Sequence, residues 1–408
     1  MTSSRQHPRD LPPPVMVEGE REFQSMLEDL KGQSIIAFDT EADSFFNYRE
    51  KVCLIQVTVE DRDYIVDPLA DFDLTPLGEV FEDPDRCIVF HDGEYDILIL
   101  KRDYDFQFAG LFDTRVAAAA IGESSPGLAS VLKKYFEVEL DKTLQRSNWS
   151  QRPLDPKQIS YARLDTRYLI PLMAKFEEEL ERQKRVEIVQ GEFLRLEAIE
   201  PVDRSFKPDE FVRLKGVRDL SPLERQALRE LFILRDSLAE ELNRPPFKVM
   251  SNQVLINIAQ ALPTNSRSLI NVPMFSSRMV RKMGDRILDA IDEAVHRGPL
   301  EKLPQLPPKD GAIALDDLQY ELHERLRFWR KQCAESENLD SSLVMNRHVL
   351  MRIAVARPQS LDDFRAVEGF LEWQANRFGA ELVDIARSFE RDANSGNLIT
   401  AKNKRGRR

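Results

Sequence analysis

The sequence predicts a mixed α/β domain followed by two small all-α domains. Three observations indicate this fold class. Short apolar segments typical of strands come first and then alternate with helical segments, as far as about residue 190. The rest is almost wholly helical to residue 393. Within that helical part, one pattern occurs twice, shifted by 95 positions.

The first domain begins after a polar, proline-rich lead-in, which we expect to be disordered. Three consecutive strands, expected to be antiparallel, then precede a fourth strand and two helices. The expected strands are 34–42, 52–60, 63–67 and 87–91, and the expected helices are 92–103 and 115–122.

One long helix is expected at residues 155–183. Asp155 can cap its start and Pro156 suits the first helical position, whereas Pro171 should kink it near the middle. Apolar residues recur along it at helical spacing. They are Leu169, Leu172, Met173, Phe176 and Leu180.

The helical repeats keep their register without a gap, which indicates duplicated compact bundles, because a period of 95 residues exceeds that of solenoid units. Matching pairs include Leu231 and Leu326, Arg235 and Arg330, Met250 and Met345, Ile258 and Ile353, and Gly284 and Gly379. A loop with four prolines at 297–311 separates the copies. We therefore expect a lead-in at 1–15, an α/β domain at 16–203, helical domains at 204–296 and 312–395, a linker at 297–311 and a basic tail at 396–408.

Composition sets wide bounds. A chain of 408 residues should form two or three domains, because single cores rarely extend past about 250 residues. The net charge of −12 argues against coating nucleic acid over the whole surface, but it permits a local basic groove. Cys53, Cys87 and Cys333 lack the spacing of a zinc site or a disulfide framework. Neither a signal peptide nor a membrane span is recognisable, so we expect a cytoplasmic protein with no membrane partner.

Four carboxylates form the most informative pattern in the first domain. Asp39 and Glu41 end an apolar strand and point to the same face, since they are two residues apart. Asp96 lies in the first turn of the helix after the fourth strand, and Asp165 lies in the long helix. Oxygen donors without sulfur or nitrogen beside them suit two hard divalent cations, Mg²⁺ or Mn²⁺, which is the equipment for cutting phosphodiesters.

Each of these residues also has a structural interpretation. An Asp-x-Glu triplet is common at strand ends, and Asp96 could interact only with a helix dipole. His91, at the end of the fourth strand, could support a metal-bound acid or could be a core histidine. Tyr161 lies four residues before Asp165 on the same helix face, where it could orient the attacking water or simply pack. The combination favours a nuclease.

The order of the motifs, with DxE first, then an acid early in a helix, then YxxxD, resembles the tyrosine-type DEDD family of 3′–5′ exonucleases. The surrounding segments at 38–45, 51–58, 141–154 and 161–172 are similar to those of ribonuclease D. The helical repeats resemble the helicase-and-ribonuclease-D C-terminal (HRDC) domain, the first copy more clearly, at 234–263. The resemblance extends from about residue 18 to residue 395.

This resemblance implies an RNase H-like sheet and a 3′–5′ exoribonuclease that releases nucleoside 5′-monophosphates, with trimming of tRNA precursors as the expected role. It implies that Asp39, Glu41, Asp96 and Asp165 hold two divalent cations and that Tyr161 positions the nucleophilic water. RNA is the implied partner, and no obligate protein partner is inferred. An exonuclease acting on DNA is the runner-up, because the acids alone do not discriminate. A non-catalytic nucleic-acid-binding scaffold is the third possibility.

RNA contacts are less evident in the sequence. Lys142, Arg146 and Arg152 flank Trp149 in a basic loop that could bind phosphates and stack a base. A tryptophan packed beneath a loop is the structural alternative. The tail AKNKRGRR could add non-specific phosphate affinity or could be a solvated end.

Overall fold

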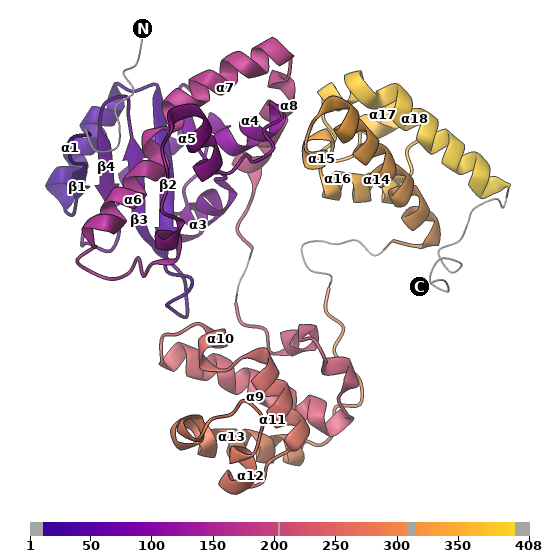
Figure 1. The fold of residues 1–408 in the computed structure, drawn as a ribbon. Helices are drawn as coiled ribbons and strands as arrows, with labels where there is room; N and C mark the ends of the chain where they lie inside the picture. Colours follow the sequence, from indigo (N-terminus) through magenta and orange to yellow (C-terminus); the bar gives the residue numbers. More distant parts are fainter. Residues whose placement is uncertain (1–10, 203–204, 308–314, 396–408) are drawn as a thin grey trace. The chain divides into compact units, whose positions relative to one another are not determined.

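The computed structural model describes residues 11–202, 205–307 and 315–395 (Figure 1). The basic tail and most of the lead-in lie outside the described residues. Contacts divide the chain into two compact units. One, here called the sheet unit, comprises Met1–Glu41, Val52–Pro201 and Pro308–Arg408, and the other, the helical unit, comprises Ala42–Lys51 and Val202–Pro307.

A mixed sheet forms the centre of the sheet unit, as the sequence predicts. Among the described residues its strands follow the order β1-β4-β3-β2-β5-β6. The pair β3–β4 is antiparallel, whereas β1–β4, β2–β5 and β5–β6 are parallel. The strands are β1 (Val15–Val17), β2 (Ile35–Ala42), β3 (Val52–Thr58), β4 (Asp63–Val66), β5 (Cys87–Phe90) and β6 (Leu111–Asp113).

The first strand and the helix after it are not among the elements expected from the sequence. Three residues that follow a proline run give no strand periodicity, and β1 exists because it pairs in parallel with β4, with Val15 opposite Tyr64. The helices of the first half of the sheet unit are α1 (Glu20–Lys31), α2 (Gly78–Glu82), α3 (Glu94–Tyr104), α4 (Thr114–Ala120), α5 (Leu128–Phe136), α6 (Pro156–Arg167), α7 (Leu169–Gln183) and α8 (Val186–Ala198), with short 3₁₀ helices η2 (Thr75–Leu77) and η3 (Lys142–Arg146).

The expectation of one long helix at residues 155–183 is wrong. The segment forms two helices, α6 and α7, that meet at Tyr168. Pro171 has no backbone N–H, and its ring excludes the carbonyl four residues earlier, so the hydrogen-bond ladder cannot run through. The break lets the two helices pack differently. Helix α6 packs on β3 and β4, whereas α7 packs on α4 and β5.

The two helical repeats are confirmed as copies of one fold, since the short helices coincide at the shift of 95 residues. Arg235 donates to the carbonyl oxygen of Met250 at 3.2 Å, and Arg330 donates to that of Met345 at 2.9 Å. The first copy contains η4 (Pro208–Arg213), η5 (Val217–Asp219), α9 (Pro222–Glu241), α10 (Pro246–Val249), α11 (Asn252–Ala261), α12 (Ser266–Ile270) and α13 (Ser277–Arg297). The second contains α14 (Asp317–Glu337), α15 (Ser341–Val344), α16 (Arg347–Ala356), α17 (Leu361–Arg365) and α18 (Glu372–Asn394).

Residues 42–51, which begin with the last residue of β2, belong to the helical unit by their contacts. The Tyr48 hydroxyl donates to Asp236 at 2.7 Å, and the Tyr48 backbone N–H donates to Asn243 at 3.2 Å. The ammonium of Lys248 lies 4.3 Å from the centroid of the Phe46 ring. These contacts tie the loop to α9 and α10.

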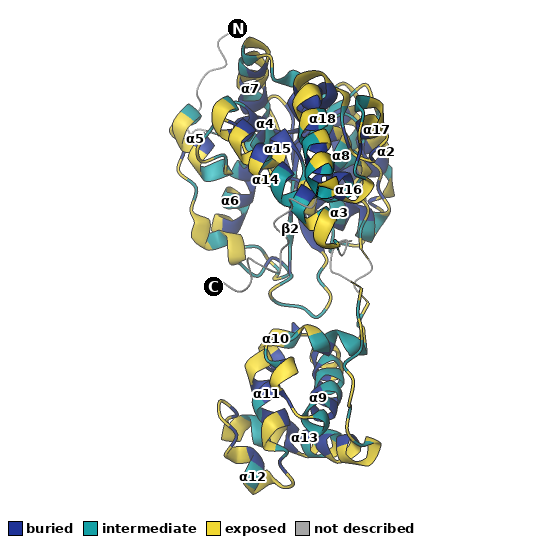
Figure 2. Ribbon diagram, turned by 90° about the vertical axis from the view of Figure 1, so that its right-hand side faces the viewer, coloured by how far each residue is buried: buried dark blue, intermediate teal, exposed yellow. Residues whose placement is uncertain are grey.

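Burial follows the helix faces that pack against neighbouring elements (Figure 2). Among the described helices, none has the length and apolar character needed to cross a bilayer.

Two buried polar contacts fasten α6 to the sheet. Arg163 Nε donates to Asp63 on β4 at 2.5 Å, and the hydroxyls of Thr166 and Thr58 lie 2.7 Å apart.

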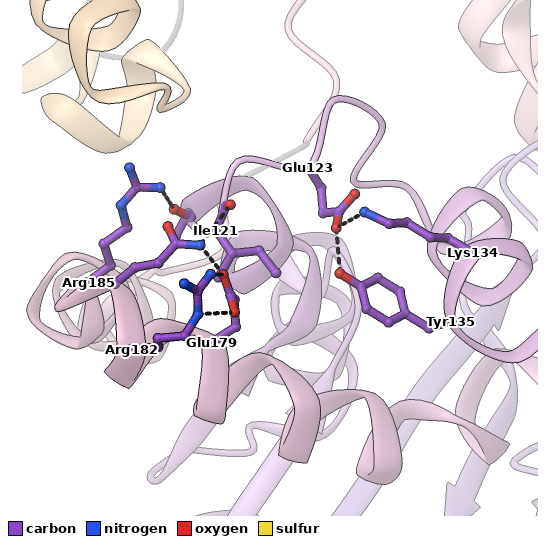
Figure 3. Close-up of polar contacts among 9 residues, drawn as sticks. Ile121, Glu123, Lys134, Tyr135, Glu179, Arg182 and Arg185 are labelled. Atoms are coloured by element: carbon purple, nitrogen blue, oxygen red, sulfur yellow. Dashed lines mark hydrogen bonds and ion pairs between the residues drawn. The ribbon is translucent and has the colours of Figure 1, made fainter.

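Removing the guanidinium of Arg163 should loosen α6. We expect Arg163→Leu to lower the local stability by about 3 kcal/mol, because the buried Asp63 carboxylate would keep only one cationic partner, Arg167 at 3.4 Å, and the hydroxyl of Thr58. Hydrogen exchange of peptides covering β4 and α6 measures this loss. The control is Arg182→Leu, which removes an exposed pair with Glu179 (Figure 3) and should change exchange little. Equal exchange rates in both variants would contradict the role of Arg163.

Candidate functional site

Three of the expected acids meet between β2 and α6. Asp39 and Glu41 lie near the end of β2, and Asp165 projects from α6. Carboxylate oxygens of these three residues all lie within 4.8 Å of one another. Asp165 is buried, while Asp39 and Glu41 are half-buried. Asp39 and Asp165 therefore share one site, although they are 126 positions apart in the chain.

The fourth acid, Asp96, is held against the same strand. Its Oδ1 accepts the backbone N–H of Thr40 at 3.0 Å and the Thr40 hydroxyl at 2.5 Å. Since Thr40 lies between Asp39 and Glu41, these bonds fix the first turn of α3 to β2. The negative charge of Asp96 raises the pKa values of Asp39, Glu41 and Asp165, so all four acids form one electrostatic cluster.

The cluster resists ionisation when no cation is present. Burial, and then repulsion from the neighbouring carboxylates, holds the pKa values of Asp39, Glu41 and Asp165 well above their usual range. Burial raises the pKa of Asp96 to about 6. Hard cations prefer oxygen donors and would offset this repulsion. The donor set therefore fits divalent cations such as Mg²⁺ or Mn²⁺.

Tyr161 lies one helical turn before Asp165 and is half-buried. Burial is the main cause that raises the pKa of its phenol above the usual value, and the charge of Asp165 adds to it. The phenol is therefore neutral at physiological pH and can both donate and accept a hydrogen bond. Its ring centroid lies 6.1 Å from that of Trp149, which packs beside it.

Two of the expected RNA contacts have structural roles instead. Trp149 is only 1% exposed, so its ring cannot stack on a base, and the structural alternative holds. Arg152 donates to both oxygens of Asp67, at 2.5 and 2.7 Å, and to the carbonyl oxygen of Cys53 at 2.7 Å. Its guanidinium therefore anchors the loop to the sheet. Lys142 and Arg146, both exposed, stay predicted RNA contacts.

His91 contacts a hydroxyl. Its Nδ1 lies 2.9 Å from Thr114 Oγ1, and that hydroxyl donates to the carbonyl of Phe90 at 3.0 Å. Because the hydroxyl has only one proton and donates it to Phe90, its oxygen accepts from His91. Nδ1 of His91 therefore carries a proton and donates to Thr114. Burial lowers the pKa of His91 to about 4, so the imidazole is neutral at physiological pH. Within the described part of the chain, no hydrogen bond joins it to the four acids.

The sequence analysis missed Asp113, a buried acid that organises the turn before α3. Its Oδ2 accepts the N–H of Gly93 at 2.8 Å, and its Oδ1 accepts the N–H groups of Arg115 and Val116 at 2.8 and 3.0 Å. Gly93 is required here, because an added Cβ would lie 2.5 Å from the Cβ of Phe90. The sequence signal is an aspartate directly after a strand and before a helix.

Family models match most of the described chain. A model described as 3′–5′ exonuclease matches residues 14–181, and the HRDC domain model matches residues 224–291 and 319–385. The first match contains the four acids and Tyr161. The HRDC matches start 95 positions apart, in agreement with the repeat.

Curated relatives support the same relationship. The chain is 32% identical to ribonuclease D of Desulfotalea psychrophila over 290 residues, which cover 68% of this chain and 76% of that protein. It is 30% identical to the exosome complex exonuclease RRP6 of Saccharomyces cerevisiae over 297 residues, which cover 69% of this chain but only 40% of the relative. The crystal structure of Escherichia coli RNase D shares the fold, with a TM-score of 0.63, 21% identity, and coverage of 92% of this chain and 99% of that one.

Relieving the repulsion among the acids should stabilise the metal-free protein. We expect Asp39→Asn to raise the melting temperature at pH 7 in EDTA by at least about 2 °C, which corresponds to about 1 kcal/mol for a unit of this size. The pKa of Asp96 lies near 6 when folded and near 4 when unfolded, so the native state binds more protons across that window. The stability of the wild type should therefore fall as the pH rises through this window. The fall should be smaller in the variant, because Asp39, whose pKa is also raised by burial, no longer titrates.

Calorimetry in EDTA between pH 4 and pH 8 measures both effects. The matched control is Asp61→Asn, at an exposed position outside the cluster, which should follow the wild type. Mn²⁺ should then raise the melting temperature of the wild type and of the control more than that of Asp39→Asn. A lower melting temperature for Asp39→Asn at pH 7 in EDTA would contradict the repulsion.

Proposed function

Since the chain belongs to the ribonuclease D family, and is thus a ribonuclease with a 3′–5′ exonuclease domain, we propose that it shortens RNA one nucleotide at a time from the 3′ end. The products would be nucleoside 5′-monophosphates. The observation that carries the proposal is the meeting of Asp39, Glu41 and Asp165 oxygens within 4.8 Å, with Asp96 held beside them. A phosphodiester at this place would face four oxygen-donor acids and one neutral phenol.

Asp39, Glu41, Asp96 and Asp165 are the residues that would hold two divalent cations, either Mg²⁺ or Mn²⁺. When bound, such a pair supplies an activated water and stabilises the leaving 3′ oxygen. The acids are fitted for this because strand β2 and helices α3 and α6 hold them at fixed positions. Asp96 adds rigidity, since Thr40 donates both its backbone N–H and its hydroxyl to it.

Tyr161 would orient the attacking water. Its phenol stays protonated because burial and the nearby acids oppose its ionisation. The oxygen can therefore accept a hydrogen bond from water or donate one to a phosphate oxygen. The packing of Trp149 against the Tyr161 ring restricts the positions that the phenol can take. Such orientation is worth about 10²- to 10⁴-fold in rate in comparable sites.

Stable RNA precursors, tRNA precursors in particular, are the substrates we propose. The name of the E. coli structural neighbour describes an exoribonuclease involved in structured RNA processing, and the yeast relative is named as an exosome exonuclease. We place this activity in the cytoplasm. The chain covers 40% of the yeast relative, so no exosome partner is proposed. The two HRDC domains would add RNA contacts outside the catalytic residues.

Removing the Tyr161 hydroxyl should slow the chemical step. We expect Tyr161→Phe to lower kcat by about 10²- to 10⁴-fold with little change in KM, since the ring and its packing remain. Single-turnover cleavage of a 5′-labelled RNA measures this. The control is Tyr64→Phe, which removes a hydroxyl that donates to Asp29 at 2.6 Å on the far side of β3 from β2. Equal loss in both variants would assign the effect to packing.

Replacing Asp165 should separate turnover from RNA binding. We expect Asp165→Asn to abolish trimming of a tRNA precursor with a 3′ extension, because one ligand of the proposed cations is lost. The Kd for the same RNA, measured in EDTA by fluorescence anisotropy, should stay within about twofold of the wild type. Loss of binding in proportion to activity would favour a nucleic-acid-binding scaffold.

A further inference from the structure

A buried amide lies in the sheet next to the acids and has no assigned role. Gln56 on β3 is 0% exposed. Within the described residues, neither its Oε1 nor its Nε2 has a hydrogen-bond partner. Buried polar groups are nearly always paired, so an amide with both ends free needs an explanation such as a bound ion, a water or a catalytic role.

The direction of this side chain follows from strand register. Gln56 pairs with Ile65 on β4, so the two side chains project from the same face of the sheet. Ile65 packs with Trp149 and with Ala162 of α6. Two residues along β3, Thr58 lies on that face too, and its hydroxyl is 2.7 Å from Thr166 in α6. Gln56 therefore points toward α6.

The acids project from this same face on the neighbouring strand. In the sheet, β3 lies between β4 and β2. Asp39 and Glu41 of β2 project toward α6, because their oxygens lie within 4.8 Å of the Asp165 carboxylate. Adjacent strands are about 4.8 Å apart, so the strand that carries Gln56 lies between the strand of Ile65 and the strand of the acids, and all of these side chains project from the same face. Helix α6 packs over this face. Its buried residues include Asp165 as well as Ala162 and Thr166.

We propose that Gln56 is a positioning residue for the acid cluster, whose Nε2–H group donates toward the carboxylates through one bridging water. This inference rests on the proposed function. A neutral N–H donor stabilises the ionised form of a carboxylate, which is the form that holds a cation, and adds no charge of its own. The amide of glutamine fits a buried strand position, donates hydrogen bonds and carries no charge.

A simpler interpretation is that the site tolerates an inert buried amide. The two interpretations predict opposite results for Gln56→Leu, which removes both polar atoms and nearly keeps the side-chain volume. An inert amide could be replaced with no loss of function. A positioning amide could not, because the carboxylates would lose the donor that favours their ionised form.

The test uses the full-length chain and Mn²⁺ alone as the probe. We expect Gln56→Leu to weaken Mn²⁺ binding by about 10- to 100-fold in titration calorimetry, the usual cost of losing a group that orients metal ligands. At a fixed, subsaturating Mn²⁺ concentration kcat should fall, and excess Mn²⁺ should restore part of it, while KM for RNA stays unchanged. The melting temperature in EDTA should not fall, since no hydrogen bond between the amide and another described protein group is lost.

The matched control is Thr58→Val, a polar-to-apolar change on the same strand and face. It breaks contacts with Thr166 and Asp63, so the melting temperature should fall while the Mn²⁺ affinity stays at the wild-type value. A Gln56→Leu affinity within twofold of the wild type overturns the role of Gln56, provided that the wild type binds Mn²⁺ and cuts RNA. If the wild type does neither, the proposed function fails as well.

Discussion

Mutual repulsion among four buried or half-buried carboxylates is the constraint on which the rest of this structure depends. Asp39, Glu41, Asp96 and Asp165 would separate if their backbone segments were free to move, since no lysine or arginine among the described residues lowers the pKa values of these acids. Holding such acids together requires rigid elements and neutral donors. Both are present around the cluster.

Different contacts hold the two helices that bring Asp96 and Asp165 to strand β2. Thr40 holds Asp96 through two hydrogen bonds, and Asp113 holds the turn at Gly93 through the backbone N–H groups around it. Helix α6, which carries Asp165, is fastened to the sheet through the ion pair of Arg163 with Asp63. The break near Pro171 also contributes, because it lets α6 lie over β3 and β4 while α7 packs elsewhere. The scaffold thus supplies the stability that the site itself lacks.

The sequence was informative where a local pattern had one physical meaning. The DxE and YxxxD spacings put their side chains on common faces whatever the packing, and the repeat at 95 residues could be recognised without any structure. The sequence was uninformative where tertiary contacts determine whether an element forms or what a side chain contacts. Strand β1 exists through its pairing with β4, and Trp149 with Arg152 resembles a basic aromatic loop until the buried partner Asp67 is known. Gln56 sits in an apolar run, and only the register of β3 shows which way it points.

The most direct test of the account is product analysis on a 5′-labelled single-stranded RNA and its DNA counterpart, with Mg²⁺, with Mn²⁺ and with EDTA. If the four acids and Tyr161 act as proposed, the products form a ladder that shortens from the 3′ end of the RNA with either metal and is absent in EDTA. Preferential shortening of the DNA would contradict the assignment of RNA as substrate. Intact RNA and DNA with both metals, in a protein that still binds RNA, would contradict catalysis by the four acids and Tyr161.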